Sequence, residues 1–325
     1  MVGRKAFLYN ALIWTERKLS RNPAGKLLKK IRPAVSAYRH LYKTATPSET
    51  IVTTIRGHRV HLDPADPDIC RHVLLDEGSW EPKQTEVFLA FVRPGMVVVD
   101  VGANFGHYTL LAARAVGEKG KVYAFEPCPR NYTMLARNVR ENNYAYVETV
   151  PKAVSNRGGT AKLYLSARSS GGHKLAEGLG RGAFVEVETV SLDDYFREVS
   201  GGIDVLKLDT EGAEDLILDG MRVVLGSSPN MVLFTEFYPN AMRAFGRIPE
   251  GYIRRLLDYG FRIRALDEDR GTEFPVGMSD VPDLVEALSR EGAPRDVINL
   301  VCVRGQQSER RPAYNGAPDG ASVSA

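Results

Sequence analysis

The chain has 325 residues, of which 43% are hydrophobic and 26% are charged, a composition typical of a soluble globular protein. This length leaves room for one large domain or two small ones. No apolar run reaches the roughly 18 residues that a membrane-spanning helix needs. Cys70, Cys128 and Cys302 lie far apart, which excludes a disulfide framework or a zinc site and fits reduced thiols in a cytosolic protein.

The charge is distributed unevenly. Residues 1–45 contain eleven Lys or Arg and one acid, Glu16, so this N-terminal arm carries a net charge near +10. The remaining residues contain 32 basic and 39 acidic side chains and are near −7. The mildly basic pI of about 8.6 is therefore a property of the arm. The acidic remainder argues against a nucleic-acid substrate.

The N-terminal arm is predicted to be helical over residues 4–43, with breaks at Pro23 and Pro33. Leu8, Leu12, Thr15 and Leu19 share one helical face, and Phe7, Ala11 and Trp14 lie beside it. Two explanations stay open: a helix packed on the body with a solvated basic face, or a basic amphipathic helix on an anionic membrane. The apolar stretch 6–14 is short and no small-residue cleavage site follows it, so we do not interpret it as a signal peptide. We expect a cytoplasmic protein that could contact the inner face of the membrane.

Residues 46–95 are predicted to form a small cap region. Residues 50–55 and 59–62 alternate like strands around Arg56-Gly57-His58, which indicates a hairpin. A helix is expected from Thr85 to Phe91, ended by Pro94-Gly95.

From residue 96 onwards, strand and helix patterns alternate, which predicts an α/β domain with a mostly parallel sheet. The expected strands are 97–101, 121–125, 146–150, 203–209, 231–236, 261–265 and 298–303. The expected helices lie near 107–116, 129–141, 214–224, 249–259 and 283–290. Residues 161–165 and 185–190 alternate like hairpin strands, joined by a Gly- and Ser-rich stretch, 166–182, that is expected to be mobile. The domain is expected to span 96–304, followed by a disordered tail, 305–325.

A glycine turn, from Asp100 through Gly102 and Asn104 to Gly106, follows the first of these strands. Glycines here let the backbone approach a ligand, and Glu126, at the end of the next strand, suits a ribose diol. Asn104 stands where a dinucleotide motif has its second glycine, and no Walker motif is present. Because Asp100 would repel phosphate and attract a cation, the turn favours S-adenosylmethionine over NAD.

Residues 96–303 resemble the FkbM family of S-adenosylmethionine-dependent methyltransferases. The resemblance rests on several blocks in order, at 78–82, 99–109, 120–127, Asn138 with Asn142 and Asn143, 150–155, 189–194, 204–214 and 299–302. It implies the class I methyltransferase fold, a seven-stranded, mostly parallel sheet with an antiparallel last strand and helices on both faces.

The resemblance also implies roles for individual residues. Gly102, Asn104 and Gly106 would line the methionine and ribose part of the donor, with Asp100 nearby or orienting the turn. Glu126 would take the ribose hydroxyls, Ala153 would border the adenine, and Asp209 would face both donor and acceptor. Glu81 matches the upstream block and could close over the donor or lie in a surface turn, and Tyr108 and Thr109 could contact the donor.

Methylation of a hydroxyl needs alignment with the methyl group and benefits from a base or a metal. Asp209, Glu211 and Glu236 lie at or just beyond the carboxyl ends of the expected strands 203–209 and 231–236, the ligand-binding edge of such a sheet. Asp209 is the preferred base, although it could instead only position the acceptor or the donor. Glu211 could be catalytic or structural, and Glu214 is interpreted as structural at the start of a helix.

Three further positions carry weaker signals. Lys207 lies in an apolar strand and needs a partner such as Asp209 or Glu236, which favours an orienting role. His107 is interpreted as a capping or packing residue. His173 could be carried to the acceptor by a lid, although an exposed histidine without function is the simpler interpretation.

Asp209 with Glu211 or Glu236 could also hold Mg²⁺, since these are oxygen ligands. We expect an enzyme that O-methylates a hydroxyl of a sugar, a glycan precursor or a secondary metabolite, which is what the resemblance implies. An N- or other-acceptor methyltransferase on the same fold, or a non-catalytic donor-binding module, is the alternative.

Overall fold

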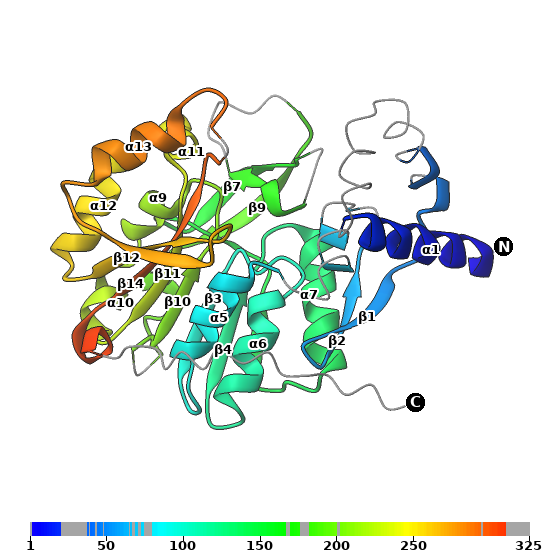
Figure 1. Ribbon diagram of the computed structural model, residues 1–325. Helices are drawn as coiled ribbons and strands as arrows, with labels where there is room; N and C mark the ends of the chain where they lie inside the picture. The colour runs from blue at the N-terminus through cyan, green and yellow to red at the C-terminus, as the bar shows by residue number, and fades with distance from the viewer. Residues whose placement is uncertain are drawn as a thin grey trace.

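The computed structural model describes residues 2–20, 38, 40–42, 44–47, 49–64, 66, 69–70, 73–74, 80–166, 170–175, 182–199, 202–293 and 295–309. Within them, an α/β domain follows a helix and a hairpin (Figure 1). The middle of the N-terminal arm, much of the stretch expected to be mobile and residues 310–325 lie outside the described residues. Residues 305–309, expected to begin a disordered tail, form the 3-10 helix η2 (Gly305–Glu309).

The described part of the central sheet has eight strands rather than the expected seven. Across the sheet they are ordered β13 (Thr272–Val276), β12 (Arg262–Asp267), β14 (Ile298–Val303), β11 (Val232–Phe237), β10 (Val205–Leu208), β3 (Val97–Val101), β4 (Lys121–Phe125) and β5 (Val147–Val150). Strands β11, β10, β3, β4 and β5 are mutually parallel, and β14 runs antiparallel between β11 and β12. The mostly parallel sheet with an antiparallel last strand is therefore confirmed.

The eighth strand, β13, extends the sheet at one edge by pairing with β12. It contains Pro275, and a proline in such a run argues against a strand because it has no N–H for the ladder. An edge strand accepts a proline because one side of it needs no partner. The sequence pattern predicts seven strands and does not include this one.

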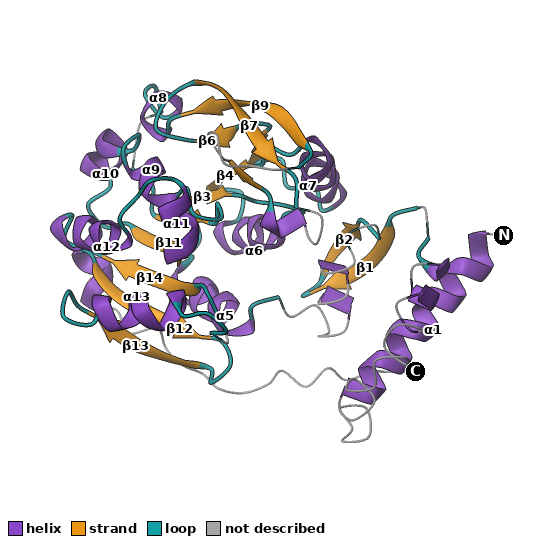
Figure 2. Cartoon of the chain, turned by 90° about the horizontal axis from the view of Figure 1, so that it is seen from above, coloured by secondary structure: helices purple, strands orange, loops and turns teal. Residues whose placement is uncertain are grey.

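Helices cover both faces of the sheet, because successive side chains of each strand point to opposite sides. Val99, Leu206 and Leu208 belong to one apolar cluster, under α8 (Leu192–Tyr195), α9 (Glu214–Leu218), α10 (Arg222–Ser227), α11 (Pro239–Ala244), α12 (Pro249–Asp258) and α13 (Val281–Ser289). Val98 and Val205 belong to the opposite cluster, under α5 (Pro82–Phe91) and α6 (His107–Val116). Figure 2 shows both layers.

The helix expected over 214–224 is divided into α9 and α10. The division falls at Gly220, where a Cβ would lie 2.7 Å from the carbonyl oxygen of Ser155. The chain therefore turns at Gly220 because it packs there against the backbone of another segment.

A smaller sheet lies beside the main one. Its order is β6 (Ala153–Val154), β9 (Phe184–Val190), β7 (Gly159–Tyr164) and β8 (Lys174–Leu175), and β7 pairs with β9 in an antiparallel manner. This confirms the two hairpin strands expected between the third and fourth strands of the domain.

The N-terminal hairpin, β1 (Ile51–Ile55) and β2 (His58–Leu62), is joined to the domain through α7 (Pro129–Glu141). Asn138 accepts a hydrogen bond from the amide of His61 at 2.7 Å and donates to its carbonyl at 3.1 Å. Asn142 binds the backbone of Arg59 in the same way, at 3.0 and 2.8 Å. These two asparagines, one helical turn apart, satisfy the free edge of β2 as a neighbouring strand would.

Helix α1 (Val2–Ser20) lies at the margin of the molecule, beside the hairpin (Figures 1 and 2). No helix among the described residues is long and apolar enough to cross a membrane.

Candidate active site

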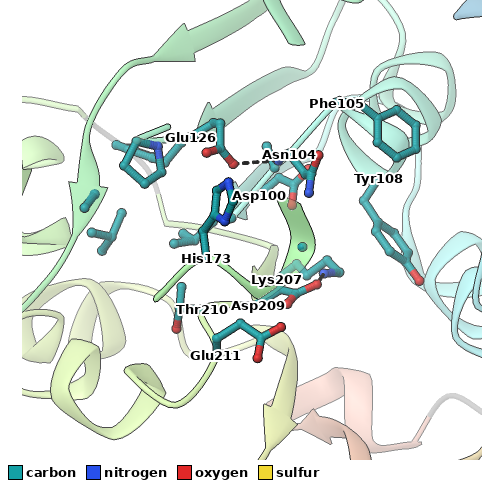
Figure 3. Close-up of a pocket in the computed structure, with 18 of the residues that line it drawn as sticks. Asp100, Asn104, Phe105, Tyr108, Glu126, His173, Lys207, Asp209, Thr210 and Glu211 are labelled. Carbon is teal, nitrogen blue, oxygen red and sulfur yellow. Dashed lines mark hydrogen bonds and ion pairs between the residues drawn. The ribbon is translucent and has the colours of Figure 1, made fainter. Parts of the chain in front are cut away.

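A cavity of about 440 Å³ opens at the carboxyl ends of β3, β4, β10 and β11 (Figure 3). This is the edge at which open parallel sheets bind ligands. The small sheet supplies a further wall through Leu163, Leu175 and their neighbours. The predicted residues that line the cavity are Glu81, Asp100, Gly102, Asn104, Tyr108, Glu126, Ala153, Asp209, Glu211 and Glu236.

The glycines of the turn are required by close packing against other segments, as well as by the approach of a ligand to the backbone. Gly102 has φ 81°, and a Cβ on it would lie 1.9 Å from the carbonyl oxygen of Asp209. Gly106 has φ 97°, and its Cβ would lie 2.8 Å from Leu135. Gly106 does not line the cavity, so it shapes the turn without forming part of the wall that was expected of it.

Asp100 lines the cavity at the end of β3 (Figure 3). It is 2% exposed, and Oδ2 accepts a hydrogen bond of 2.6 Å from Thr109 Oγ1. Oδ1 has no hydrogen-bond partner. Burial raises the pKa of Asp100, and the charge of Lys207 opposes that effect. Thr109 itself does not line the cavity, so its expected donor contact is replaced by an indirect role through Asp100.

Glu126 is fixed by the turn that faces it. Its Oε2 accepts a hydrogen bond of 2.8 Å from the amide of Asn104, and its Oε1 one of 2.8 Å from the amide of Cys128. Asn104 holds the left-handed conformation, with φ 51°, that brings its amide to the carboxylate. Burial raises the pKa of Glu126 to about 7, although these backbone hydrogen bonds oppose the shift.

Lys207 is the buried cation of the site. Its ammonium lies 2.5 Å from Asp209 Oδ2 and 4.5 Å from the centre of the Tyr108 ring, and the residue is 2% exposed. Burial disfavours its charge, but Asp209, Glu81 and Asp100 outweigh burial and hold the pKa of Lys207 above its usual value. The orienting partnership expected with Asp209 is thus present.

Glu81 closes one side of the cavity from the segment before α5. It accepts hydrogen bonds from the Tyr108 hydroxyl at 2.9 Å and from Asn299 Nδ2 at 3.3 Å. Its backbone is left-handed, with φ 44°, a conformation that is uncommon for a residue other than glycine. Burial raises the pKa of Glu81, and the charge of Lys207 opposes this. Of the two interpretations of Glu81, the structure shows a cavity-lining residue.

Two further carboxyl groups face the same space. Burial, followed by repulsion from Asp209, raises the pKa of Glu211 to about 8. The same causes, in the same order, hold the pKa of Glu236 well above its usual value, and its Oε2 has no hydrogen-bond partner. Glu214, by contrast, is buried away from the cavity. It accepts from Thr210 N and Oγ1, both at 2.9 Å, which fits its structural interpretation.

These carboxylates do not assemble into a metal site. Among the described residues, no group of three or more His, Cys, Asp or Glu side chains is arranged to hold a metal ion. Asp209 directs Oδ2 to Lys207, whose charge a nearby Mg²⁺ would oppose. The residues present therefore do not fit the Mg²⁺ option.

The two histidines of the site differ in role. His107 is buried, with Nε2 3.2 Å from Thr85 Oγ1, and burial lowers its pKa to about 3, which suits a packing residue. His173 lines the cavity between Glu126 and Asp209 (Figure 3). Its Nδ1 accepts a 3.0 Å hydrogen bond from the amide of Ser166. The neutral ring therefore carries its proton on Nε2 and offers a donor rather than a base.

Sequence reasoning missed several lining residues, among them Trp80, Lys152 and Thr210, and also Asn299, which orients Glu81. Trp80 and Asn299 do belong to blocks of the family resemblance, which was the one signal that pointed to them. Glu81, beside Trp80, is itself a predicted residue, whereas no neighbour of Asn299 indicates the cavity, because that segment is distant in sequence from the glycine turn.

The chain is similar to known methyltransferases. A family model described as a methyltransferase FkbM domain matches residues 100–263. Methyltransferase sdnD of Sordaria araneosa is 32% identical, over 38% of this chain and 60% of sdnD. The tRNA (adenine(58)-N(1))-methyltransferase TrmI of Thermus thermophilus is 33% identical, over 31% of this chain and 44% of TrmI. The chain thus spans less than two thirds of either relative. The crystal structure of Aeropyrum pernix fibrillarin in complex with S-adenosyl-L-methionine gives a TM-score of 0.38, with 12% identity over 78% of this chain and 82% of fibrillarin.

Proposed function

Because the chain belongs to the FkbM methyltransferase family, we propose that it transfers a methyl group from S-adenosylmethionine to a hydroxyl of a sugar, a glycan precursor or a secondary metabolite. The observation that carries the proposal is the Lys207–Asp209 pair, which opens into the same cavity as Asp100 and Glu126. One cavity thus combines groups suited to the donor with a carboxylate suited to an acceptor.

The charges of the cavity favour this donor over a dinucleotide. Glu126 offers a carboxylate to a ribose diol, and the carboxyl group of Asp100 in the same wall suits an ammonium or sulfonium group. A pyrophosphate would meet these acidic side chains, which repel it wherever they are ionised. S-adenosylmethionine carries two cationic groups and no phosphate.

Asp209 is the base in this proposal. It would accept the hydroxyl proton as the acceptor oxygen forms its bond to the methyl carbon, while the electron pair of the breaking S–C bond goes to the sulfonium sulfur. Lys207 holds the Asp209 carboxylate in position through their 2.5 Å ion pair. Alignment of oxygen and methyl by the cavity walls can supply roughly 7–11 kcal/mol of the barrier. Base assistance contributes a further factor of about 10² to 10⁴.

Glu211 fits a different part of the reaction. Its pKa of about 8 means that the Glu211 carboxyl group is mostly protonated at neutral pH and can donate a hydrogen bond. It would hold the acceptor hydroxyl rather than remove its proton. Burial also holds the pKa of Glu236 well above its usual value, so this wall presents neutral, hydrogen-bonding carboxyl groups that suit an uncharged acceptor.

Other acceptors fit less well. The relative TrmI is named for methylation of tRNA at an adenine nitrogen. In this chain the residues outside the N-terminal arm are near −7 in net charge, and the cavity wall is acidic, so a phosphate backbone would be repelled. The buried ion pair would serve little purpose in a donor-binding module without turnover.

Calorimetric titration tests the donor. We expect S-adenosylmethionine to bind and NAD to give no heat under the same conditions, and the reverse result would overturn the proposal. Incubation of the protein with extract and isotopically labelled donor, followed by identification of the labelled product, then tests the acceptor. A label on a nucleic acid, or on nitrogen, would contradict the hydroxyl assignment.

A further inference from the structure

Helix α1 is apolar on two opposite sides, and the described residues cover one of them. Tyr9 and Ile13, which are 1% and 8% exposed, pack against Tyr42, Ala45 and Ile51. The Tyr9 and Tyr42 hydroxyls also share a hydrogen bond of 2.6 Å. This side attaches the helix to the rest of the chain. The sequence pattern predicts an apolar face that includes Leu8 and Leu12; Leu12 packs against this cluster, whereas Leu8 is 45% exposed.

The opposite side, which we call the outer face, consists of Phe7, Ala11, Trp14 and Lys18. The spacing of these residues places them on one stripe of a helix. Phe7 is 76% exposed and Trp14 is 57% exposed, which is unusual for side chains of this size. The ammonium of Lys18 lies 4.1 Å from the centre of the Trp14 ring, so aromatic and basic groups occupy the same surface.

The sequence of the N-terminal arm carries charge of almost one sign. Residues 1–45 contain eleven Lys or Arg and one acid. That acid, Glu16, is 5% exposed and accepts a 2.5 Å hydrogen bond from the Tyr38 hydroxyl, so it is withdrawn from the surface. Two exposed aromatic side chains on a strongly basic arm complement a surface that is anionic outside and apolar beneath.

We propose that the outer face of α1 docks the protein on an anionic phospholipid membrane. Aromatic side chains favour the boundary between headgroups and acyl chains, where Trp is enriched. Lysine and arginine are attracted to anionic headgroups, and two such signals together give stable peripheral binding. No described helix can span the membrane, so the contact lies along the surface.

The alternative occupants fit the surface less well. Nucleic acid would use the positive charge but would leave two large apolar side chains with no base to stack on in a duplex. A second copy of the chain would bring two strongly basic arms together, which costs free energy by like-charge repulsion. The membrane satisfies both the charge and the aromatic groups.

Co-sedimentation with vesicles tests this proposal in the full-length protein. Vesicles of phosphatidylcholine with about 30% phosphatidylglycerol are compared with vesicles of phosphatidylcholine alone. The anionic lipid gives the first vesicles a negative surface potential, which attracts polybasic segments. We expect the protein to pellet with the anionic vesicles, and to be released at high salt because screening shortens electrostatic range. The double variant Phe7→Ala/Trp14→Ala should lower the partition coefficient at least about tenfold.

The matched control is Ile248→Ala, which removes a side chain that is 70% exposed on the α/β domain. It should bind the anionic vesicles as the unaltered protein does. A blue shift of tryptophan emission on binding, lost in Trp14→Phe, would show that this side chain enters the interface. Equal binding by the double variant and the control, or no binding to anionic vesicles, would overturn the proposal. A dimer in sedimentation velocity that the double variant dissociates would assign the outer face to a second copy instead.

Discussion

Lys207 and Asp209, two residues apart on β10 and the loop that follows it, form a 2.5 Å ion pair inside the cavity, with Lys207 almost fully buried. The ammonium also faces Glu81 and Asp100, so one cation compensates carboxylates from three separate segments. The pair therefore joins the donor side of the cavity to the acceptor side.

If Asp209 is the base, Asp209→Asn should lower kcat by about 10²-fold or more and leave the donor affinity within a few-fold, because the amide keeps the shape but accepts no proton. Initial rates with labelled donor and calorimetry measure the two quantities. Glu211→Gln is the comparison, and it should mainly raise KM for the acceptor, because the amide still donates a hydrogen bond. Equal losses of kcat in the two variants would remove Asp209 from its role.

Removal of the cation should destabilise the fold. Lys207→Met leaves several buried carboxylates without a counter-charge, and the loss of one partner of a buried pair costs about 3–5 kcal/mol. Urea unfolding measures the change. Lys152→Met is the control, since Lys152 pairs with Glu188 at 2.9 Å with both side chains exposed. It should cost less than about 1 kcal/mol. If both variants lose a similar free energy of unfolding, Lys207 does not stabilise the fold through its charge among the buried carboxyl groups.

Gly102→Ala should destabilise the protein by about 2–4 kcal/mol, since its Cβ would lie 1.9 Å from the carbonyl oxygen of Asp209 and its φ is positive. Gly95→Ala separates the two effects, because Gly95 has φ 83° and no atom within 4 Å of the added Cβ. It should cost only about 1–2 kcal/mol. Denaturant midpoints compare the stabilities of the variants. Equal losses of stability would show that the segments after β3 and β10 move apart to accept the added Cβ without a loss of stability.

Donor affinity should depend on pH through Glu126. The ionised carboxylate accepts the ribose hydroxyls, and its pKa of about 7 means that the ionised fraction rises between pH 6 and pH 8. We expect the association constant for S-adenosylmethionine to be about tenfold lower at pH 6 than its limiting value at high pH. Calorimetry at several pH values measures it, and Glu126→Gln should bind weakly with a flat profile. A persistent slope in Glu126→Gln would assign the titration to another group.

The same pKa gives the opposite sign for stability. Because the folded value of about 7 lies above the value of 4.5 expected when the group is exposed, the protonated group favours the folded state. Its contribution is present below pH 4.5 and is lost as the pH rises through 7. Glu126→Gln should therefore reduce the fall in the free energy of unfolding over this range, which urea titrations at pH 5 and pH 8 would measure. An unchanged fall would contradict the assignment.

Most strands and helices of the domain could be predicted because their periodicity is written in contiguous residues. The strands at 97–101, 121–125 and 298–303 have the predicted bounds, as do the helices at 107–116 and 129–141. The errors occur where a distant segment decides the local structure. Gly220 divides a helix because Ser155 lies against it, and β13 forms because β12 offers a free edge.

The sequence by itself determined the order of strands and helices, the glycine turn, and the choice of a cationic donor, since each depends on neighbouring residues and on their charge. Only the tertiary structure decided that Glu81 and Lys207 meet in one cavity, and that Asn299 hydrogen-bonds to Glu81. It also decided which side of α1 is covered and which stays exposed. Contacts between distant segments follow from how strands pair and helices pack, and no local pattern specifies them.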